Sequence, residues 1–281
     1  MKLRYVIEKE MLVKEYFDYV GLSHHLKKKV RALDNIVING CKGKNYYPLK
    51  KGDVLELEFK EAMNDEYQAN YQDKVDILYE DDYLLVINKP SNIASQPSHM
   101  HPIDNVLSIL KAHFLDNTID ANIHLVNRLD FPTSGLMIVS KSGICQYELG
   151  KTKIIKKYLG EVKGTNISDG VIEKAIEREE KASIKRHISD SGKKAITRYH
   201  KIKERDGNSI LDIELLTGRC HQIRVHLSSI GYPLIGDKLY DDSNKDIKED
   251  LHLHLHAYYL SFYHPFNHKL LEFTNYPSWY N

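Results

Sequence analysis

Cysteine and long apolar runs are scarce in this chain. Its 281 residues include only three cysteines, Cys41, Cys145 and Cys220, which are too few and too scattered for a disulfide framework or a thiolate metal site. No apolar run approaches the roughly 20 residues of a membrane span. The first ten residues carry five charged side chains, unlike a secretory leader. We therefore expect a protein of a reducing, cytoplasmic compartment.

A large excess of charge of one sign is also missing, because the formal net charge is +1. The charges are nevertheless uneven along the chain. Residues 1–60 carry 13 Lys and Arg against 8 acids, residues 61–87 carry one Lys against 8 acids, and residues 151–205 carry 16 Lys and Arg against 8 acids. Two basic segments are consistent with a protein that binds a polyanion through particular surface regions. An ordinary solvated surface explains the same counts equally well.

Residues 124–142 contain the stretch around which we interpret the rest of the chain. Asp130 stands in Arg128-Leu129-Asp130, ahead of Pro132 and Gly135, and an apolar run at 136–139 follows. The run predicts a buried strand, and the Pro and Gly predict a turn before it. Asp130 is thus expected at a turn beside a rigid strand, where reactive side chains are often displayed. An isolated Arg-x-Asp would more often be a structural pair.

The longer pattern carries more information. Arg-Leu-Asp-x-x-Thr-Ser-Gly-Leu followed by a hydrophobic strand resembles the signature of the RluA family of pseudouridine synthases. Residues 218–226, Gly-Arg-x-His-Gln-Ile-Arg-x-His, resemble the second signature of that family. Weaker matches are Lys89-Pro90, the Lys-x-Tyr strand that contains Tyr158, and Gly-Lys-x-Ala-x-Thr at 192–197. Asn92 and Asn127 stand where the family commonly has Gly and His.

The resemblance implies an α+β fold for residues 74–281, with a mixed, mainly antiparallel sheet and flanking helices and loops. It also implies isomerisation of uridine in RNA, with Asp130 as the catalytic carboxylate and no cofactor. Arg224 lies between apolar positions, so we expect it to be buried, to pair with Asp130 and to keep it charged and oriented. Tyr158 would stack on the detached uracil and take part in proton transfer at carbon 5.

Residues 1–60 are predicted to form a small α+β module before this domain. Val13, Tyr16, Phe17 and Val20 mark one helix, and Ser23 is a candidate N-cap for a second helix with Leu26, Val30 and Leu33 inside. The module resembles the alpha-L RNA-binding motif. That resemblance implies RNA contacts through Lys27, Lys28, Lys29 and Arg31, whereas a packing module would leave them merely solvated. Residues 61–73 are polar and acidic, and we interpret them as a linker.

Three basic residues of the large domain complete the predicted RNA contacts. Arg128 would hold the RNA open around a flipped-out base, because a base inside a helix is out of reach. Lys89, at the end of a strand, is a candidate phosphate contact, although a strand-end lysine is more often plain surface. Arg219, in the second signature, is the third predicted RNA contact. The strand at 192–199 is expected to be exposed because Ala195 and Thr197 are small.

Several alternatives remain at this stage. His252, His254 and His256 alternate along a strand and would suit a metal, but the region resembles closing strands of the family, in which no metal is used. A phosphotransferase with an Asp nucleophile needs Mg²⁺ and further carboxylates, which the surroundings of Asp130 do not offer. A non-catalytic RNA-binding protein on the same scaffold is a third reading. Ribosomal RNA is the preferred substrate, with transfer RNA as the alternative and a monomer as the default state.

Overall fold

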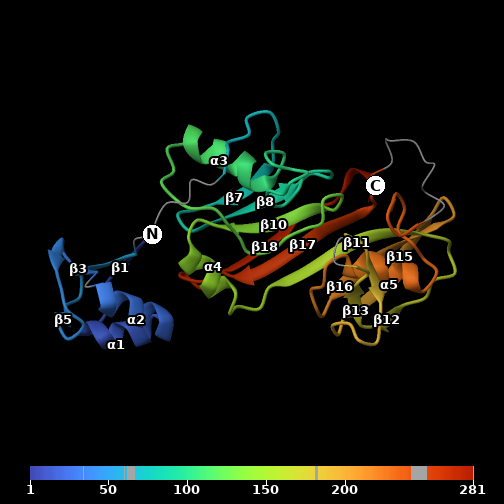
Figure 1. The fold of residues 1–281 in the computed structure, drawn as a ribbon. Coiled ribbons are helices and arrows are strands. Elements are labelled where there is room, and N and C mark those ends of the chain that lie inside the picture. Colours follow the sequence, from blue (N-terminus) through green and yellow to red (C-terminus); the bar gives the residue numbers. More distant parts are fainter. Residues whose placement is uncertain (34, 60, 62–66, 181–182, 242–251, 281) are drawn as a thin grey trace.

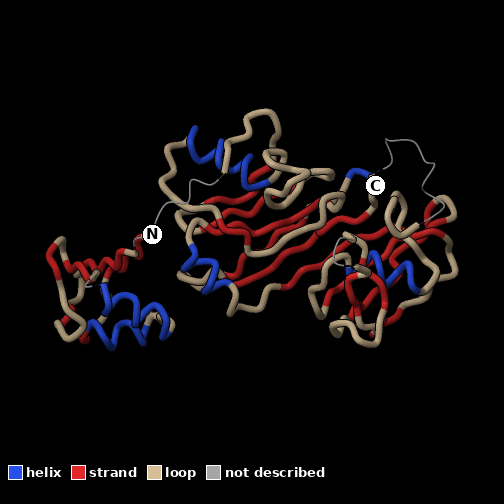
Figure 2. The backbone as a smooth tube through the Cα atoms, viewed as in Figure 1, coloured by secondary structure: helices blue, strands red, loops and turns tan. Residues whose placement is uncertain are grey.

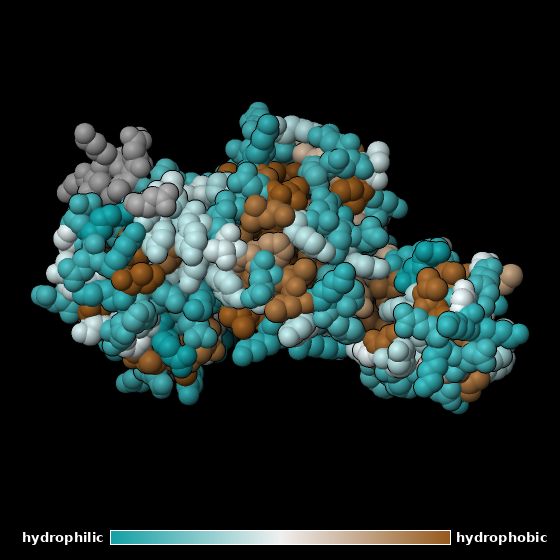
Figure 3. Space-filling view, turned by 180° about the vertical axis from the view of Figure 1, so that it is seen from behind, coloured by the Kyte–Doolittle hydropathy of each residue, from teal (hydrophilic) through white to brown (hydrophobic). Residues whose placement is uncertain are grey.

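The structure is a computed structural model that describes residues 1–33, 35–59, 61, 67–180, 183–241 and 252–280, with the side chains of 31–33 excepted. It consists of a small N-terminal lobe and a larger body built on one broad sheet (Figures 1 and 2). Figure 3, seen from behind, shows the lobe projecting from one end of the body. Among the described residues, no helix is long and apolar enough to cross a membrane.

The N-terminal lobe packs two helices against a four-stranded sheet of order β1-β6-β3-β4. Ser23 caps the second helix through a hydrogen bond from the Leu26 amide (3.2 Å), as predicted. Leu26 and Val30 are buried as expected, whereas the Leu33 side chain lies outside the described part. Asn39 and Gly40 both have positive φ and form the tight turn between two strands. The elements are β1 (Lys2–Val6), β2 (Met11–Leu12), α1 (Val13–Tyr19), α2 (His24–Leu33), β3 (Ile36–Ile38), β4 (Cys41–Lys42), β5 (Pro48–Leu49) and β6 (Val54–Glu58).

The body contains a ten-stranded sheet whose main path runs β12-β15-β16-β11-β17-β10-β8-β7, with β18 beside β17 and β9 beside β10. All described pairings in this sheet are antiparallel except that of β10 with β17. The mainly antiparallel sheet predicted from the family resemblance is confirmed. The strands are β7 (Asp76–Glu80), β8 (Leu84–Lys89), β9 (His124–Leu125), β10 (Ser134–Ser140), β11 (Ile155–Lys163), β12 (Gly170–Glu173), β15 (Ile196–Arg205), β16 (Asn208–Leu215), β17 (Leu255–Tyr263) and β18 (Leu270–Thr274).

Alternation along the central strands divides the core between two faces of the sheet. Met137 and Val139 of β10 point to the face covered by α3 (Val106–Asp116) and reached by α5 (Gln222–Ser229). Leu136 and Ile138 point to the other face, against α4 (Gly143–Leu149). Figure 1 shows α3 and α4 on opposite sides of the same strands, with α5 at the far end. The described part also contains a short hairpin, β13 (Ile176–Arg178) and β14 (Arg186–Ile188), and a 3-10 turn, η2 (Ser278–Tyr280).

The lobe and the body make direct contacts through α4. Ile144 of α4 belongs to the apolar core of the lobe. The Ser23 hydroxyl donates to Glu148 (2.6 Å), and the His25 ring lies 4.5 Å from that of Tyr147. Asn70, within the predicted linker, is buried and donates to the Ile103 carbonyl oxygen (3.0 Å). Residues 67–73 therefore pack on the body, while 62–66 lie outside the described residues.

In the strand expected to be exposed at 192–199, Lys193, Lys194 and Arg198 are exposed, but the two small residues on which the prediction rested lie in the interior. Ala195 and Thr197 are only 1% and 0% exposed. The Thr197 hydroxyl oxygen accepts a hydrogen bond from the Gln222 side chain (3.0 Å) and lies 2.9 Å from His226 Nδ1. The prediction of exposure was wrong because small residues here allow the close approach of α5 to β15.

Candidate active site

Hydrogen bonds to the main chain fix the loop that carries Asp130. Ser95 Oγ donates to the Leu129 carbonyl oxygen (2.6 Å) and accepts from the Leu129 amide (3.1 Å). On the other side of Asp130, Ser91 donates to the Pro132 carbonyl oxygen (2.7 Å). The segment that follows the Lys-Pro motif therefore holds the Asp130 loop before and after the carboxylate. Asn92, at the turn of this segment, has the left-handed φ of 59° that allows an Asn to replace Gly.

Lys89 also holds the Asp130 loop in place and is not at the surface. Its side chain is 0% exposed, and its Nζ donates to the carbonyl oxygens of Pro90 (2.8 Å), Ile93 (2.8 Å) and Phe131 (3.2 Å). Burial lowers the pKa of Lys89 to about 7, against the opposing effect of Asp130. The prediction of a phosphate contact is corrected here, since a side chain enclosed by three carbonyl groups does not reach RNA.

Asp130 lies in a pocket of about 640 Å³ between the body's central strands and α5. The pocket lining includes four arginines, Arg128, Arg186, Arg219 and Arg224, together with Lys156 and Tyr158. Asp130 is half-buried within this lining. Such a concentration of guanidinium groups produces a positive field that favours a polyanionic ligand.

Arg224 is buried, as predicted, but its carboxylate partner is not Asp130. Its Nε and Nη2 donate to the two carboxylate oxygens of Asp237, both at 2.8 Å. The guanidinium carbon also lies 5.1 Å from the centre of the Tyr240 ring. The expected direct pair with Asp130 is therefore wrong. Asp237 follows Gly236 in a turn that places it against α5, and it raises the pKa of Arg224, with a further contribution from Asp130.

Tyr158 faces the pocket from β11. The pairing of β11 with β17 shifts register between Lys157 and Tyr158, an irregularity that re-aims a side chain. Tyr158 is only 6% exposed, and burial together with Asp130 raises its pKa. The ring is therefore a neutral phenol at the wall of the pocket, in the same cavity as Asp130.

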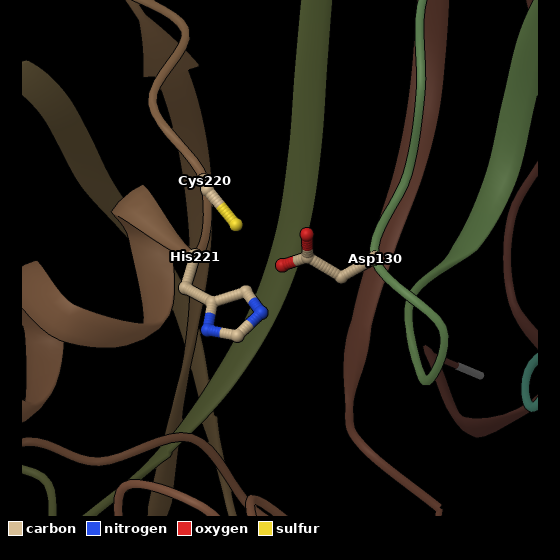
Figure 4. A group of neighbouring side chains, drawn as sticks. All are labelled: Asp130, Cys220 and His221. Atoms are coloured by element: carbon tan, nitrogen blue, oxygen red, sulfur yellow. The ribbon is translucent and has the colours of Figure 1, made fainter. Parts of the chain in front are cut away.

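Asp130, Cys220 and His221 form a close group across the pocket (Figure 4). One carboxylate oxygen, the thiol sulfur and one imidazole nitrogen all lie within 4.8 Å of one another. His221 has the left-handed φ of 56°, and its Nδ1 lies 2.8 Å from the Tyr240 hydroxyl. Burial lowers the pKa of His221, an effect that Asp130 opposes and that Arg224 and Arg186 reinforce.

The same three groups could in principle offer ligands to a metal ion. The surrounding arginines make the pocket unfavourable for a divalent cation. Burial and Asp130 raise the pKa of the Cys220 thiol, which disfavours the thiolate form that a metal requires. The arrangement fits a polar wall around an anionic substrate better than it fits a metal centre.

Comparisons with known proteins show the family of the chain. Residues 83–229 match the family model described as RNA pseudouridylate synthase. The chain is 34% identical over 270 residues to an uncharacterized RNA pseudouridine synthase, YjbO, of Bacillus subtilis, covering 94% of each chain. It is 32% identical to ribosomal large subunit pseudouridine synthase D of Buchnera aphidicola, covering 94% of this chain and 88% of that protein.

The chain belongs to the RNA pseudouridylate synthase family. The RluA-type resemblance of the sequence is thereby confirmed, and the protein is an RNA pseudouridine synthase. The solved structure of human RNA pseudouridylate synthase domain containing 1 has the same fold, with a TM-score of 0.61 over 73% of this chain and 84% of that one at 24% identity.

The predicted RNA contacts of this pseudouridine synthase have different surroundings. Arg128 is exposed at the pocket and donates to Gln96 (3.3 Å), and Arg219 is exposed there with its Nε donating to the Lys194 carbonyl oxygen (3.0 Å). In the lobe, Lys28 and Lys29 are exposed, whereas Lys27 pairs with Asp18. Arg31 lies in α2 with its side chain outside the described part. These contacts stay predictions.

The three alternating histidines of the synthase face separate partners. His252 Nδ1 lies 3.1 Å from the Asn92 amide, and His254 stacks on Trp279 while pairing with Glu161 (2.7 Å). His256 lies between the Ser134 hydroxyl (2.7 Å) and the Asn275 carbonyl oxygen (3.0 Å). Each ring is thus engaged in its own set of contacts, which supports the structural interpretation over a shared metal.

Sequence reasoning assigned no role in this site to four residues. Cys220 and Arg186 line the pocket, and Asp237 and Tyr240 contact its lining residues Arg224 and His221. Asp237 and Tyr240 stand in Gly236-Asp237-x-x-Tyr240, where no local pattern indicates that Asp237 pairs with Arg224. Arg186 lies in a short basic run, Lys185-Arg186-His187, that looks like ordinary surface. Only the packing of β14 against α5 brings it to the pocket.

Proposed function

We propose that this synthase converts specific uridines of ribosomal RNA to pseudouridine, with Asp130 as the catalytic carboxylate. The observation that carries the proposal is a carboxylate held on a loop fixed on both sides, in a pocket lined by four arginines and Tyr158. The relatives named ribosomal large subunit pseudouridine synthase D support ribosomal RNA over transfer RNA. A cytoplasmic location belongs to the same proposal.

The reaction breaks the N-glycosidic bond, turns the uracil and forms a bond from ring carbon 5 to the ribose, with loss of the proton at carbon 5. Asp130 acts as nucleophile or base in this sequence, which a carboxylate can do without leaving the site. Tyr158 stacks on the detached uracil and assists the proton transfer. Arg224, locked by Asp237, adds positive charge near Asp130 from a fixed position.

RNA enters this scheme through three groups of basic residues. Arg128 and Arg219 at the pocket hold the RNA backbone around a flipped-out uridine. Lys27, Lys28, Lys29 and Arg31 of the lobe, which we propose to be an alpha-L-type module, contact RNA outside the pocket. The reaction needs no cofactor, because the isomerisation involves neither redox chemistry nor group transfer to another molecule. A monomer is the default state in this proposal.

The proposal is tested by pseudouridine mapping on total RNA from cells with and without the gene. We expect a uridine site in ribosomal RNA to be unmodified without the protein and modified again when the wild-type gene returns. A site lost only in transfer RNA would overturn the substrate assignment. No lost site in either RNA class would count against the assigned substrates altogether.

A further inference from the structure

The hairpin β13–β14 contributes Arg186 to the lining of the pocket and is anchored by a small apolar cluster. Ile176 of β13 packs with Ala195 and with Val225 of α5, and Ile188 and Tyr240 pack against this group. The Arg186 amide donates to the Tyr240 hydroxyl oxygen (2.8 Å), which also lies against His221. The backbone of Arg186 is therefore fixed relative to the active site.

The Arg186 guanidinium lines the pocket that contains Asp130. The guanidinium also opposes the rise in the pKa of the Cys220 thiol that burial and Asp130 cause. Its Nη1, however, is buried and has no hydrogen-bond partner among the described residues. A buried charged donor without an acceptor is unfavourable, because it has lost water without a replacement. The nitrogen is thus placed to receive an acceptor that the protein alone does not supply.

The other three pocket arginines already have acceptors from the described chain. Arg224 binds the Asp237 carboxylate, Arg128 binds Gln96 and Arg219 binds the Lys194 carbonyl oxygen. Arg186 lines the cavity and differs from them in having a buried guanidinium nitrogen, Nη1, without an acceptor among the described residues. The expected partner is an anion, since hydrogen bonds from a guanidinium to an anionic oxygen are the strong ones.

We propose that Arg186 binds a phosphate oxygen of the RNA strand beside the target uridine. This inference rests on the proposed function. An RNA phosphate that approaches the Asp130 carboxylate is repelled by it, and a cation between them offsets that repulsion. A planar guanidinium matches phosphate geometry better than an ammonium does. Arg186 is thus a binding residue that holds the strand in register with Asp130.

The test compares three purified full-length variants with the wild type. Arg186→Met removes the guanidinium, and Arg186→Lys keeps the charge. Arg178→Met is the matched control, because Arg178 is the cross-strand neighbour of Arg186, is exposed and is not part of the pocket lining. The binding probe is a fluorescein-labelled oligouridylate 12-mer, and anisotropy gives its Kd from 50 to 200 mM KCl. Thermal unfolding checks that each variant is folded.

We expect Arg186→Met to weaken binding by about tenfold or more at low salt. We also expect the slope of log K against log salt to become less steep by about 0.7, the value for one phosphate contact on a single strand. Arg186→Lys should keep most of the slope and lose part of the affinity. Arg178→Met should change the affinity by less than about threefold.

Unchanged affinity and slope in a folded Arg186→Met variant would overturn the proposal. A loss of kcat on the mapped RNA with unchanged affinity would also overturn it, because it would place the contact on the reacting uracil. These results differ from a failure of the proposed function, in which the wild-type protein itself would modify no uridine. If Arg186→Met does not fold, the Arg186→Lys variant decides. A retained salt slope with reduced affinity would support the proposal. Wild-type affinity in Arg186→Lys would count against it.

Discussion

Lys89 and Ser95 position Asp130 through the backbone rather than through its carboxylate. Lys89 binds three carbonyl oxygens, one of them that of Phe131, the residue after Asp130. The Ser95 hydroxyl binds the amide and the carbonyl oxygen of Leu129, the residue before Asp130. Because neither contact uses the side-chain oxygens of Asp130, the carboxylate keeps its acceptor capacity for the substrate.

Removing the Lys89 ammonium should therefore affect both stability and turnover. In Lys89→Met three buried carbonyl oxygens lose a donor, and we expect the free energy of unfolding to fall by about 2 kcal/mol. Turnover should fall by about tenfold or more, since the loop that presents Asp130 loosens. Chemical denaturation and steady-state kinetics measure the two effects. Lys151→Met removes an ammonium whose side chain is 42% exposed beside Glu148 after α4; it is the control and should change neither. Wild-type turnover in Lys89→Met would show that the hydrogen bonds of Lys89 to the three carbonyl groups are not needed for activity.

The buried imidazole of His256 makes the stability of the folded protein depend on pH. Burial lowers its pKa to about 4, so the folded protein holds it neutral where the unfolded chain, with a pKa near 6.5, already binds a proton. The unfolded state thus binds more protons between pH 6.5 and 4, and stability contributed by His256 is lost as the pH falls through that window. The shift corresponds to about 3 kcal/mol.

His256→Gln should remove this part of the acid sensitivity. Glutamine keeps an amide N–H for the Asn275 carbonyl oxygen and does not titrate. We expect the variant to be less stable at pH 7 but to lose less further stability between pH 6.5 and 4 than the wild type. Denaturant midpoints measured across this range test the prediction. An unchanged pH dependence would mean that other groups control the acid transition.

Among the elements, β10 has a tight steric constraint at the end nearest Asp130. Gly135 has φ of 118°, and a Cβ added there would lie 2.4 Å from the Ala257 carbonyl oxygen of β17. The parallel pairing of Ser134 and Gly135 with His256 and Ala257 therefore requires glycine. This pairing joins the strand that follows the Asp130 loop to the centre of the sheet.

Gly135→Ala should consequently be far more damaging than a change at an open glycine. We expect a loss of about 3 kcal/mol or more, together with reduced activity, because the strands must separate or twist. Gly207→Ala is the matched control, since Gly207 also has a positive φ of 77° but no heavy atom within 4 Å of the added Cβ. It should cost only about 1 kcal/mol. Equal losses in the two variants would contradict the steric argument.

Local patterns in the sequence predicted most of the individual elements but not how they meet. Helical spacing identified α1 and α2, and an apolar run identified β10, because these patterns depend on neighbours along the chain. The parallel contact of β10 with β17 joins residues about 120 positions apart, and no local pattern encodes it. For the same reason the partner of Arg224 was assigned to Asp130, a motif residue, instead of Asp237.

For the whole molecule, the N-terminal lobe extends the basic surface beyond the pocket. Lys28 and Lys29 of α2 are exposed, while contacts with α4 attach the lobe to the body. A strand of RNA bound in the pocket and at the lobe would make phosphate contacts at both places. Substrates long enough to reach both should bind more tightly than short ones.

The double variant Lys28→Glu/Lys29→Glu tests whether α2 contacts RNA outside the pocket. We expect it to weaken binding of a long ribosomal RNA fragment by about tenfold or more and to reduce the salt dependence, because two phosphate contacts become repulsive. Turnover on a short oligonucleotide that fills only the pocket should be unchanged. Lys50→Glu/Lys51→Glu, on the turn before β6, is the charge-matched control. If both double variants weaken binding equally, general charge rather than α2 is responsible.

The most direct test of the central claim is release of the hydrogen at carbon 5 of uridine, followed with tritium in the RNA that mapping identifies. Formation of the new carbon–carbon bond expels that hydrogen, so the assay reports the isomerisation itself. Asp130→Asn replaces the carboxylate with an amide of the same shape, and we expect a loss of at least about a thousandfold with an unchanged unfolding temperature. Release at the wild-type rate from a folded Asp130→Asn protein would contradict the assignment of Asp130 as the catalytic residue.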